Sequence, residues 1–159
     1  MLIGTPTTYT FVTGASEGFT PLNAFDAALL DAGIGNTNLV KMSSIVPPRC
    51  RTVNIDQLSL PPGALVPTAY AAMESDIPGS IICAAIAAGW SDNENYPGLI
   101  MEYHAQGHRE DAEAIVRSMT EHGLKARGWK VAHIESVSIQ HRVAKIGAVF
   151  AGVVLWNAD

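Results

Sequence analysis

Charged residues are scarce in this sequence of 159 residues, since only 16% are Asp, Glu, Lys or Arg, while 48% are hydrophobic. That balance excludes a disordered chain and favours extensive burial, including burial at a subunit interface. Fifteen acidic against ten basic residues give a net charge of −5, and the basic residues are scattered along the chain. We therefore expect no nucleic-acid partner, because such partners select clustered Lys and Arg.

Cysteines and long apolar runs are also few. Cys50 and Cys83 show no C-x-x-C spacing, which argues against a disulfide framework and suits a reducing cytoplasm. The start of the chain lacks the basic and apolar regions of a secretion signal. The longest apolar run, from Ile146 to Trp156, is too short to cross a bilayer as a helix. We expect a cytoplasmic protein without a membrane partner, built as a single domain over 1–159.

Motifs of the common catalytic and metal sites are missing. The chain has no G-x-G-x-x-G, no G-x-x-x-x-G-K-[ST] and no G-x-S-x-G, so dinucleotide, P-loop and nucleophile-elbow sites have no local support. His104 and His108 are four residues apart, but Gly107 separates a predicted strand from a predicted helix between them, and we expect no metal site. A Ser-His-Asp hydrolase stays an alternative, because sequence alone cannot assemble a triad.

Two helices are predicted from their start, stop and periodicity signals. Thr20 and Pro21 mark the start of a helix over 21–32, and Gly33 marks its end. Asn23 and Asp26 flank its apolar face, which consists of Leu22, Phe25, Ala28, Leu29 and Ala32. The second helix is predicted over 108–123, and its inward residues are Ala112, Ile115, Val116 and Met119.

Strands are predicted where apolar residues alternate or run together between turn residues. They cover 5–14, 37–46, 63–73, 80–90, 98–107, 131–143 and 145–156. The prolines at 47 and 48 end the second of them. On strand 131–143, the alternating residues from His133 to His141 are expected to face solvent. The order of elements predicts an α+β fold with helices covering largely antiparallel sheets.

Four phrases of the sequence, taken together, resemble the pyruvoyl-dependent arginine decarboxylases. They span nearly the whole chain and read SEGFTPLNAFDAALLDAGIGNTNLVKMSSIVPP, PPGALVPTAYAAMESDIPG, GLIMEY and RGWKVAHIESV. The resemblance implies a single-domain αββα sandwich that cleaves itself into two chains. It also implies a homo-oligomer, a trimer of cleaved protomers with active sites between subunits, which converts L-arginine to agmatine and CO₂ without PLP or metal.

Within KMSSIVPP the resemblance makes Ser43–Ser44 the cleavage site. Ser44 Oγ would attack the carbonyl carbon of Ser43 and turn the amide into an ester. β-Elimination would release the Ser43 carboxylate and leave dehydroalanine at 44, which hydrolyses to a pyruvoyl group and ammonia. The products would be an N-terminal β chain, 1–43, and a C-terminal α chain, 44–159. Asn38 matches the donor to the oxyanion of the first step.

The resemblance also implies which residues act on arginine. The pyruvoyl group would form a Schiff base with the substrate amine and accept electrons as CO₂ departs. Glu102 in LIMEY matches the general acid that protonates the resulting carbanion, and burial in an apolar strand would favour its neutral form. Asp26 matches the carboxylate that binds the guanidinium through two parallel hydrogen bonds. Leu22 and Asn23 would line the same pocket.

Two alternatives stay open at this point. One keeps the pyruvoyl chemistry but acts on another amino acid, and the other is an uncleaved oligomer that binds a cationic metabolite. The sequence also leaves open whether agmatine would serve polyamine biosynthesis or acid resistance.

Overall fold

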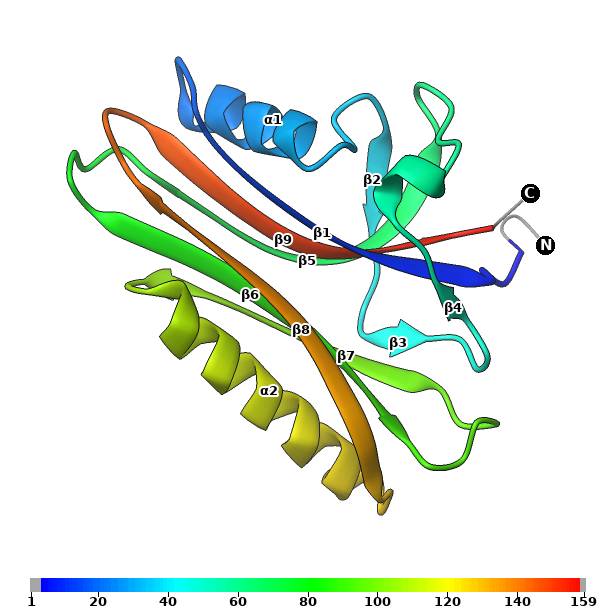
Figure 1. The fold of residues 1–159 in the computed structure, drawn as a ribbon. Coiled ribbons are helices and arrows are strands. Elements are labelled where there is room, and N and C mark those ends of the chain that lie inside the picture. The colour runs from blue at the N-terminus through cyan, green and yellow to red at the C-terminus, as the bar shows by residue number, and fades with distance from the viewer. Residues whose placement is uncertain (1–3, 158–159) are drawn as a thin grey trace.

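The computed structural model describes residues 4–157, which form nine strands, two α-helices and one short 3₁₀ helix (Figure 1). In chain order they are β1 (Thr8–Glu17), α1 (Pro21–Asp31), β2 (Asn38–Lys41), β3 (Ile45–Val46), β4 (Arg51–Thr52), the 3₁₀ helix (Ile55–Gln57), β5 (Leu65–Ser75), β6 (Ile81–Ser91), β7 (Gly98–Gln106), α2 (Arg109–Ala126), β8 (Val131–Arg142) and β9 (Gly147–Trp156). The sequence patterns predicted both helices and the long strands to within a few residues.

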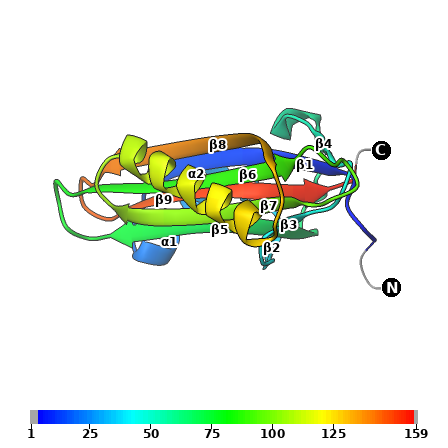
Figure 2. The same ribbon diagram turned by 90° about the horizontal axis from the view of Figure 1, so that it is seen from below.

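Two sheets pack face to face between the two helices. The first sheet has the order β2-β5-β9-β1-β4 and the second the order β3-β7-β6-β8. Helix α1 covers the outer face of the first sheet and α2 the outer face of the second, as Figure 1 shows and Figure 2 shows from below for α2. The pairs β1–β4 and β2–β5 are parallel and the other pairs are antiparallel. The predicted α+β class and the αββα layering are therefore confirmed.

The apolar core has three layers because most strands are apolar on both faces. The layer between the sheets includes Ile82, Ile86, Ile100, Val149 and Val153. The layer under α1 is built around Phe150, and the layer under α2 around Val116. Strands β6 and β9 lie inside their sheets and are buried along nearly their whole length.

Helix α1 begins and ends as predicted, and Ala28, Leu29 and Ala32 are buried as predicted, but the buried face differs at two positions. The Asn23 backbone N–H donates to Thr20 Oγ1 at 3.2 Å, and Gly33 has the positive φ of 84° that favours glycine at a helix end. The buried residues include Ala24 and Ala28, whereas Leu22 is 74% exposed, so its predicted place on the apolar face was wrong. A Cβ on Gly14 of β1 would clash with Ala28 O. This close approach of the helix backbone to β1 requires glycine at position 14.

Helix α2 runs three residues further than predicted. Gly123, taken as its end, lies inside the helix, and Leu99 and Met101 of β7 occupy the space that a side chain at 123 would need. The buried positions are Ala112, Val116, Thr120 and Leu124. Ile115 was expected inside, but it is 42% exposed.

The inner face of β8 was wrongly expected to face solvent. Val137 and Ile139 pack into the layer between the sheets, and Tyr9 Oη donates to Glu135 at 2.8 Å. Further along the same face, His141 Nε2 lies 2.6 Å from Glu17 Oε2. The polar residues of this face suggested exposure to solvent, but Glu135 and His141 are bonded to Tyr9 and Glu17 on β1 of the opposite sheet.

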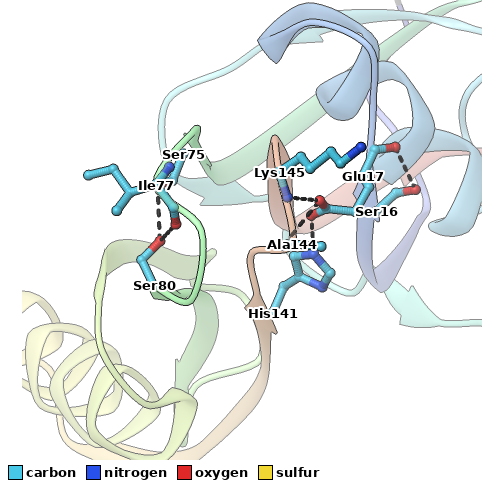
Figure 3. A network of polar contacts seen from close by, with 8 residues as sticks. All are labelled: Ser16, Glu17, Ser75, Ile77, Ser80, His141, Ala144 and Lys145. Atoms are coloured by element: carbon cyan, nitrogen blue, oxygen red, sulfur yellow. Dashed lines mark hydrogen bonds and ion pairs between the residues drawn. The ribbon is translucent and has the colours of Figure 1, made fainter.

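The Glu17 carboxylate ties the end of β1 to the turn between β8 and β9 (Figure 3). It accepts hydrogen bonds from the backbone N–H groups of Ala144, at 3.1 Å, and Lys145, at 2.7 Å. Burial raises the pKa of Glu17, but the hydrogen bonds from Lys145, His141 and Ala144 outweigh burial and hold it below its usual range. A carboxyl with a lowered pKa stabilises the folded state above its unfolded pKa, and this contribution is lost as the pH falls through the folded pKa.

We therefore expect Glu17→Gln to lower the free energy of unfolding by about 1 kcal/mol at neutral pH, after allowing for partial exposure of the side chain. The difference from the parent chain should shrink as the pH falls through the lowered pKa of Glu17. Urea denaturation at several pH values and one protein concentration measures it, in a Ser44→Ala background that keeps a single uncut chain. Glu74→Gln, at an exposed position on β5, is the control. A Glu17→Gln effect that is independent of pH would contradict this assignment.

Candidate active site

The Ser43–Ser44 peptide crosses from one sheet to the other. On its N-terminal side, Met42 N donates to Thr68 O of β5 at 3.2 Å, which continues the pairing of β2 with β5 in the first sheet. On its C-terminal side, Ile100 N of β7 donates to Ser44 O at 2.7 Å, and β3 pairs with β7 in the second sheet. The prediction of one strand over 37–46 was therefore wrong. Alternation over ten residues does not distinguish one strand from two short strands flanking a crossing.

Both ends of the crossing are fixed, and Ser43 belongs to neither strand. Ser43 is exposed and Ser44 is half-buried. Attack of Ser44 Oγ on the preceding carbonyl requires local rotation, and both serines lie outside β2 and β3. The end of β3 at Val46, directly before Pro47, is as predicted. The local structure therefore fits a self-cleaving peptide and the group it would form from Ser44.

Glu102 lies on the face of β7 that points toward the other sheet. It is two residues beyond Ile100, the residue that bonds Ser44, and side chains two apart on a strand share a face. Burial raises the pKa of Glu102, and the nearby Lys41 ammonium lowers it by less than burial raises it. The structure thus brings a carboxyl with a raised pKa into the region of Ser44, and this direction of shift suits a general acid.

Asn38 begins β2, and its side chain is bound to a neighbouring turn. Asn38 Nδ2 donates to Gly63 O at 3.0 Å, and Asn38 N donates to Ala64 O at 2.8 Å. The strand rises about 10 Å from Asn38 to Lys41, before the crossing at Ser43 begins. In this arrangement the amide holds β2 against the start of β5, and its role as an oxyanion donor stays a prediction.

The three residues predicted to bind the substrate lie on the outer side of α1. Leu22, Asn23 and Asp26 are exposed there, and Thr20 Oγ1 donates to Asn23 Oδ1 at 2.7 Å. Helix α1 packs on β1, β9 and β5 of the first sheet, whereas Ser44 and Glu102 are joined to the second sheet (Figure 1). One chain therefore presents the predicted site as two groups, one on α1 and one around the crossing.

Lys41 is the functional candidate that the sequence patterns missed. Its Nζ lies 3.9 Å from Glu102 Oε1. The available signal was a single positive charge at the end of an otherwise apolar stretch, two residues before Ser43. A lone lysine is usually a solvated surface residue, so that signal was too weak to use.

Among residues 4–157, no group of three or more His, Cys, Asp or Glu side chains is placed to hold a metal ion. No helix in the same range is both long and apolar enough to span a membrane.

Comparison with known proteins addresses the chain as a whole. The family model for pyruvoyl-dependent arginine decarboxylase matches residues 8–158. The chain is 49% identical over 151 residues to a pyruvoyl-dependent arginine decarboxylase of Methanocaldococcus jannaschii, covering 95% of this chain and 90% of the relative. It is 46% identical over 153 residues to the enzyme of that name from Pyrococcus abyssi, covering 96% of each. A match of this extent, on a fold that places Ser43–Ser44 beside Glu102, shows that the chain belongs to the pyruvoyl-dependent arginine decarboxylase family.

Proposed function

We propose that this chain cleaves itself at Ser43–Ser44 and converts L-arginine to agmatine and CO₂. The observation that most supports this proposal is that the Ser43–Ser44 peptide crosses between the two sheets near the half-buried carboxyl of Glu102, in a chain of this family. Family membership implies a covalent pyruvoyl group, which forms from Ser44. The single domain over 1–159 would then consist of a β chain, 1–43, and an α chain, 44–159.

The cut pieces would stay together through the sheet. The β chain contains β1, α1 and β2, and the α chain contains the remaining elements. Strand β1 pairs with β9 over ten residues from Thr8 to Glu17, and β2 pairs with β5. Helix α1 adds the apolar layer around Phe150. The core and the strand pairing therefore support a stable protomer after the backbone is cut.

In the reaction, the pyruvoyl group supplies the electrophilic carbonyl that takes up electrons when CO₂ leaves. Glu102 then gives its proton to the substrate α-carbon, and burial, which raises the pKa of this carboxyl, is the effect that suits a general acid. Asn38 is proposed to donate to the oxyanion of the cleavage step. Asp26 is proposed to bind the guanidinium, with Leu22 and Asn23 beside it, because a carboxylate matches its planar pair of donors.

We further propose that a complete site forms between copies of the chain. Exposed apolar side chains include two groups near the predicted site: Phe19, Leu22 and Leu30 on and before α1, and Val40 and Ile45 on either side of the crossing. Each group adjoins one half of the predicted site. Contact between two different patches is head to tail, and it gives a closed ring, such as the trimer implied by the resemblance, when the rotation between copies closes.

The test combines intact mass with release of labelled CO₂. Purified protein should give two masses, with the 44–159 fragment lighter by one ammonia than an unmodified fragment, and carboxyl-labelled L-arginine should release labelled CO₂. One uncut chain with measurable binding of arginine would favour the non-catalytic binding protein. A modified fragment that releases CO₂ from another amino acid, and not from arginine, would keep the chemistry and overturn the substrate.

We place the enzyme in the cytoplasm, without a membrane or nucleic-acid partner. Both cysteines are free thiols, with Cys83 buried and Cys50 half-buried, which suits a reducing compartment.

A further inference from the structure

The ammonium of Lys41, on a half-exposed side chain at the end of β2, lies near two groups. Its Nζ lies 3.9 Å from Glu102 Oε1 and 4.5 Å from the centre of the Tyr70 ring. The face of an aromatic ring attracts a cation, so this position is favourable for the ammonium. Lys41 therefore bridges an aromatic side chain of the first sheet and the carboxyl of β7 in the second.

The Tyr70 ring is itself fixed by packing. Its centre lies 5.0 Å from that of Phe150 on β9 and 6.4 Å from that of Phe25 on α1. A lysine side chain has many rotamers in water. Contact with a packed ring limits this freedom and keeps the charge near Glu102.

Among residues 4–157, Glu102 has one nearby positive charge, that of Lys41. Its partner in register on β6 is Ile86, and the β3 residue nearest to the crossing is Ile45. Tyr70 on β5 is the neutral phenol beneath Lys41, and His104, two residues along on the same face of β7, is exposed. Helix α2 covers the other face of that strand. Lys41 is thus the charged group that opposes the effect of burial on this carboxyl.

We propose that Lys41 is a positioning residue for decarboxylation, whose ammonium stabilises the carboxylate that Glu102 becomes when it gives up its proton. In that step the O–H bond of Glu102 breaks and a C–H bond forms at the substrate α-carbon, which supplies the electron pair. Glu102 takes a proton from water before the next turnover. The inference rests on the proposed function, because it assumes that Glu102 protonates the substrate.

The first test measures the Glu102 carboxyl directly and needs no pyruvoyl group. In a Ser44→Ala chain labelled with ¹³C at glutamate carboxyls, the Glu102 signal is assigned by its loss in Glu102→Gln and titrated by NMR. Lys41→Met should raise the pKa of Glu102 by about 0.5 to 1 unit, the effect of a unit charge about 4 Å away under water-like screening. Lys41→Arg should leave it nearly unchanged. If the pKa of Glu102 is the same in Lys41→Met as in the parent chain, the inference is overturned.

The second test follows the pH dependence of decarboxylation in the cleaved enzyme. Activity requires protonated Glu102, so it falls as the pH rises through the pKa of that carboxyl. Lys41→Met should move this basic limb to higher pH by the same amount and lower kcat at lower pH by roughly twofold, because the acid is weaker. Tyr70→Phe keeps the ring and should leave the limb in place. If the basic limb of the pH profile of Lys41→Met coincides with that of wild type, Lys41 does not act on Glu102.

The two failures can be told apart. A wild-type protein that is cleaved but releases no CO₂ from arginine defeats the proposed function, while the NMR titration still decides whether Lys41 acts on Glu102. If the wild type is active but Lys41→Met leaves the pKa of Glu102 unchanged, the role of Lys41 is wrong and the proposed function stands.

Discussion

A Ser44→Ala chain is expected to remain a single polypeptide of about 16.9 kDa and to lose decarboxylase activity by at least about 10⁴-fold, as when a nucleophile is removed. The methyl group of alanine can neither attack the Ser43 carbonyl nor become a pyruvoyl group. Both losses therefore come from one missing oxygen atom. Intact mass and labelled CO₂ release measure the two effects on the same sample.

The matched control is Ser43→Ala. The proposed role of Ser43 is to supply a carbonyl carbon, which alanine also has, so this variant should still be cut and still form the pyruvoyl group. Circular dichroism should show both variants folded, because neither hydroxyl lies in the buried core. Cleavage of the Ser44→Ala chain, or two equally uncut variants, would overturn the assignment of Ser44 as the nucleophile.

The second large effect is the recovery of activity when two inactive variants are mixed. Asp26→Ala removes the proposed guanidinium ligand, and Glu102→Gln removes the proposed acid. If a site takes Asp26 from one copy and Glu102 from the next, co-expression of the two variants should give about a quarter of wild-type activity. This is the share of sites in randomly mixed rings in which both residues are intact. Each variant alone should stay near background.

A second mixture provides the control for assembly. Wild type co-expressed with the double variant should give about a quarter of full activity if sites lie between copies, and about half if each chain holds its own site. Intact mass must show that every variant is cleaved, so that loss of activity reflects the substrate step. No recovery from the two single variants, together with half activity from the control mixture, would place Asp26 and Glu102 in one chain's site.

Local sequence signals determined much of the fold. Thr20, Pro21 and Gly33 located α1 because a cap, a fixed φ and a positive φ are properties of single residues. The long strands were recognisable because their apolar residues alternate or run together between turn residues. The burial of Ala24 on α1 was not predictable, since it depends on Gly18, a residue outside the helix where a Cβ would clash with the Ala24 backbone.

The predictions for the crossing at Ser43 and for the inner face of β8 were wrong for a related reason. Strand alternation reports which side chains share a face, but it does not report which sheet a strand joins or what lies opposite. The site residues came from a resemblance and not from pattern, and the structure added Lys41, because only the fold brings it to Glu102.

The place of β1 in the first sheet has a consequence for how often this protein can fold. Strand β1 lies between β9 and β4, yet after cleavage it belongs to the shorter piece. The uncut chain folds as one molecule, whereas the cut enzyme, once unfolded, could recover only when two separate polypeptides meet and β1 re-enters the middle of a sheet. Cleavage would thus turn a reversible folding equilibrium into a concentration-dependent assembly. The lifetime of the mature enzyme would then be set by its rate of unfolding.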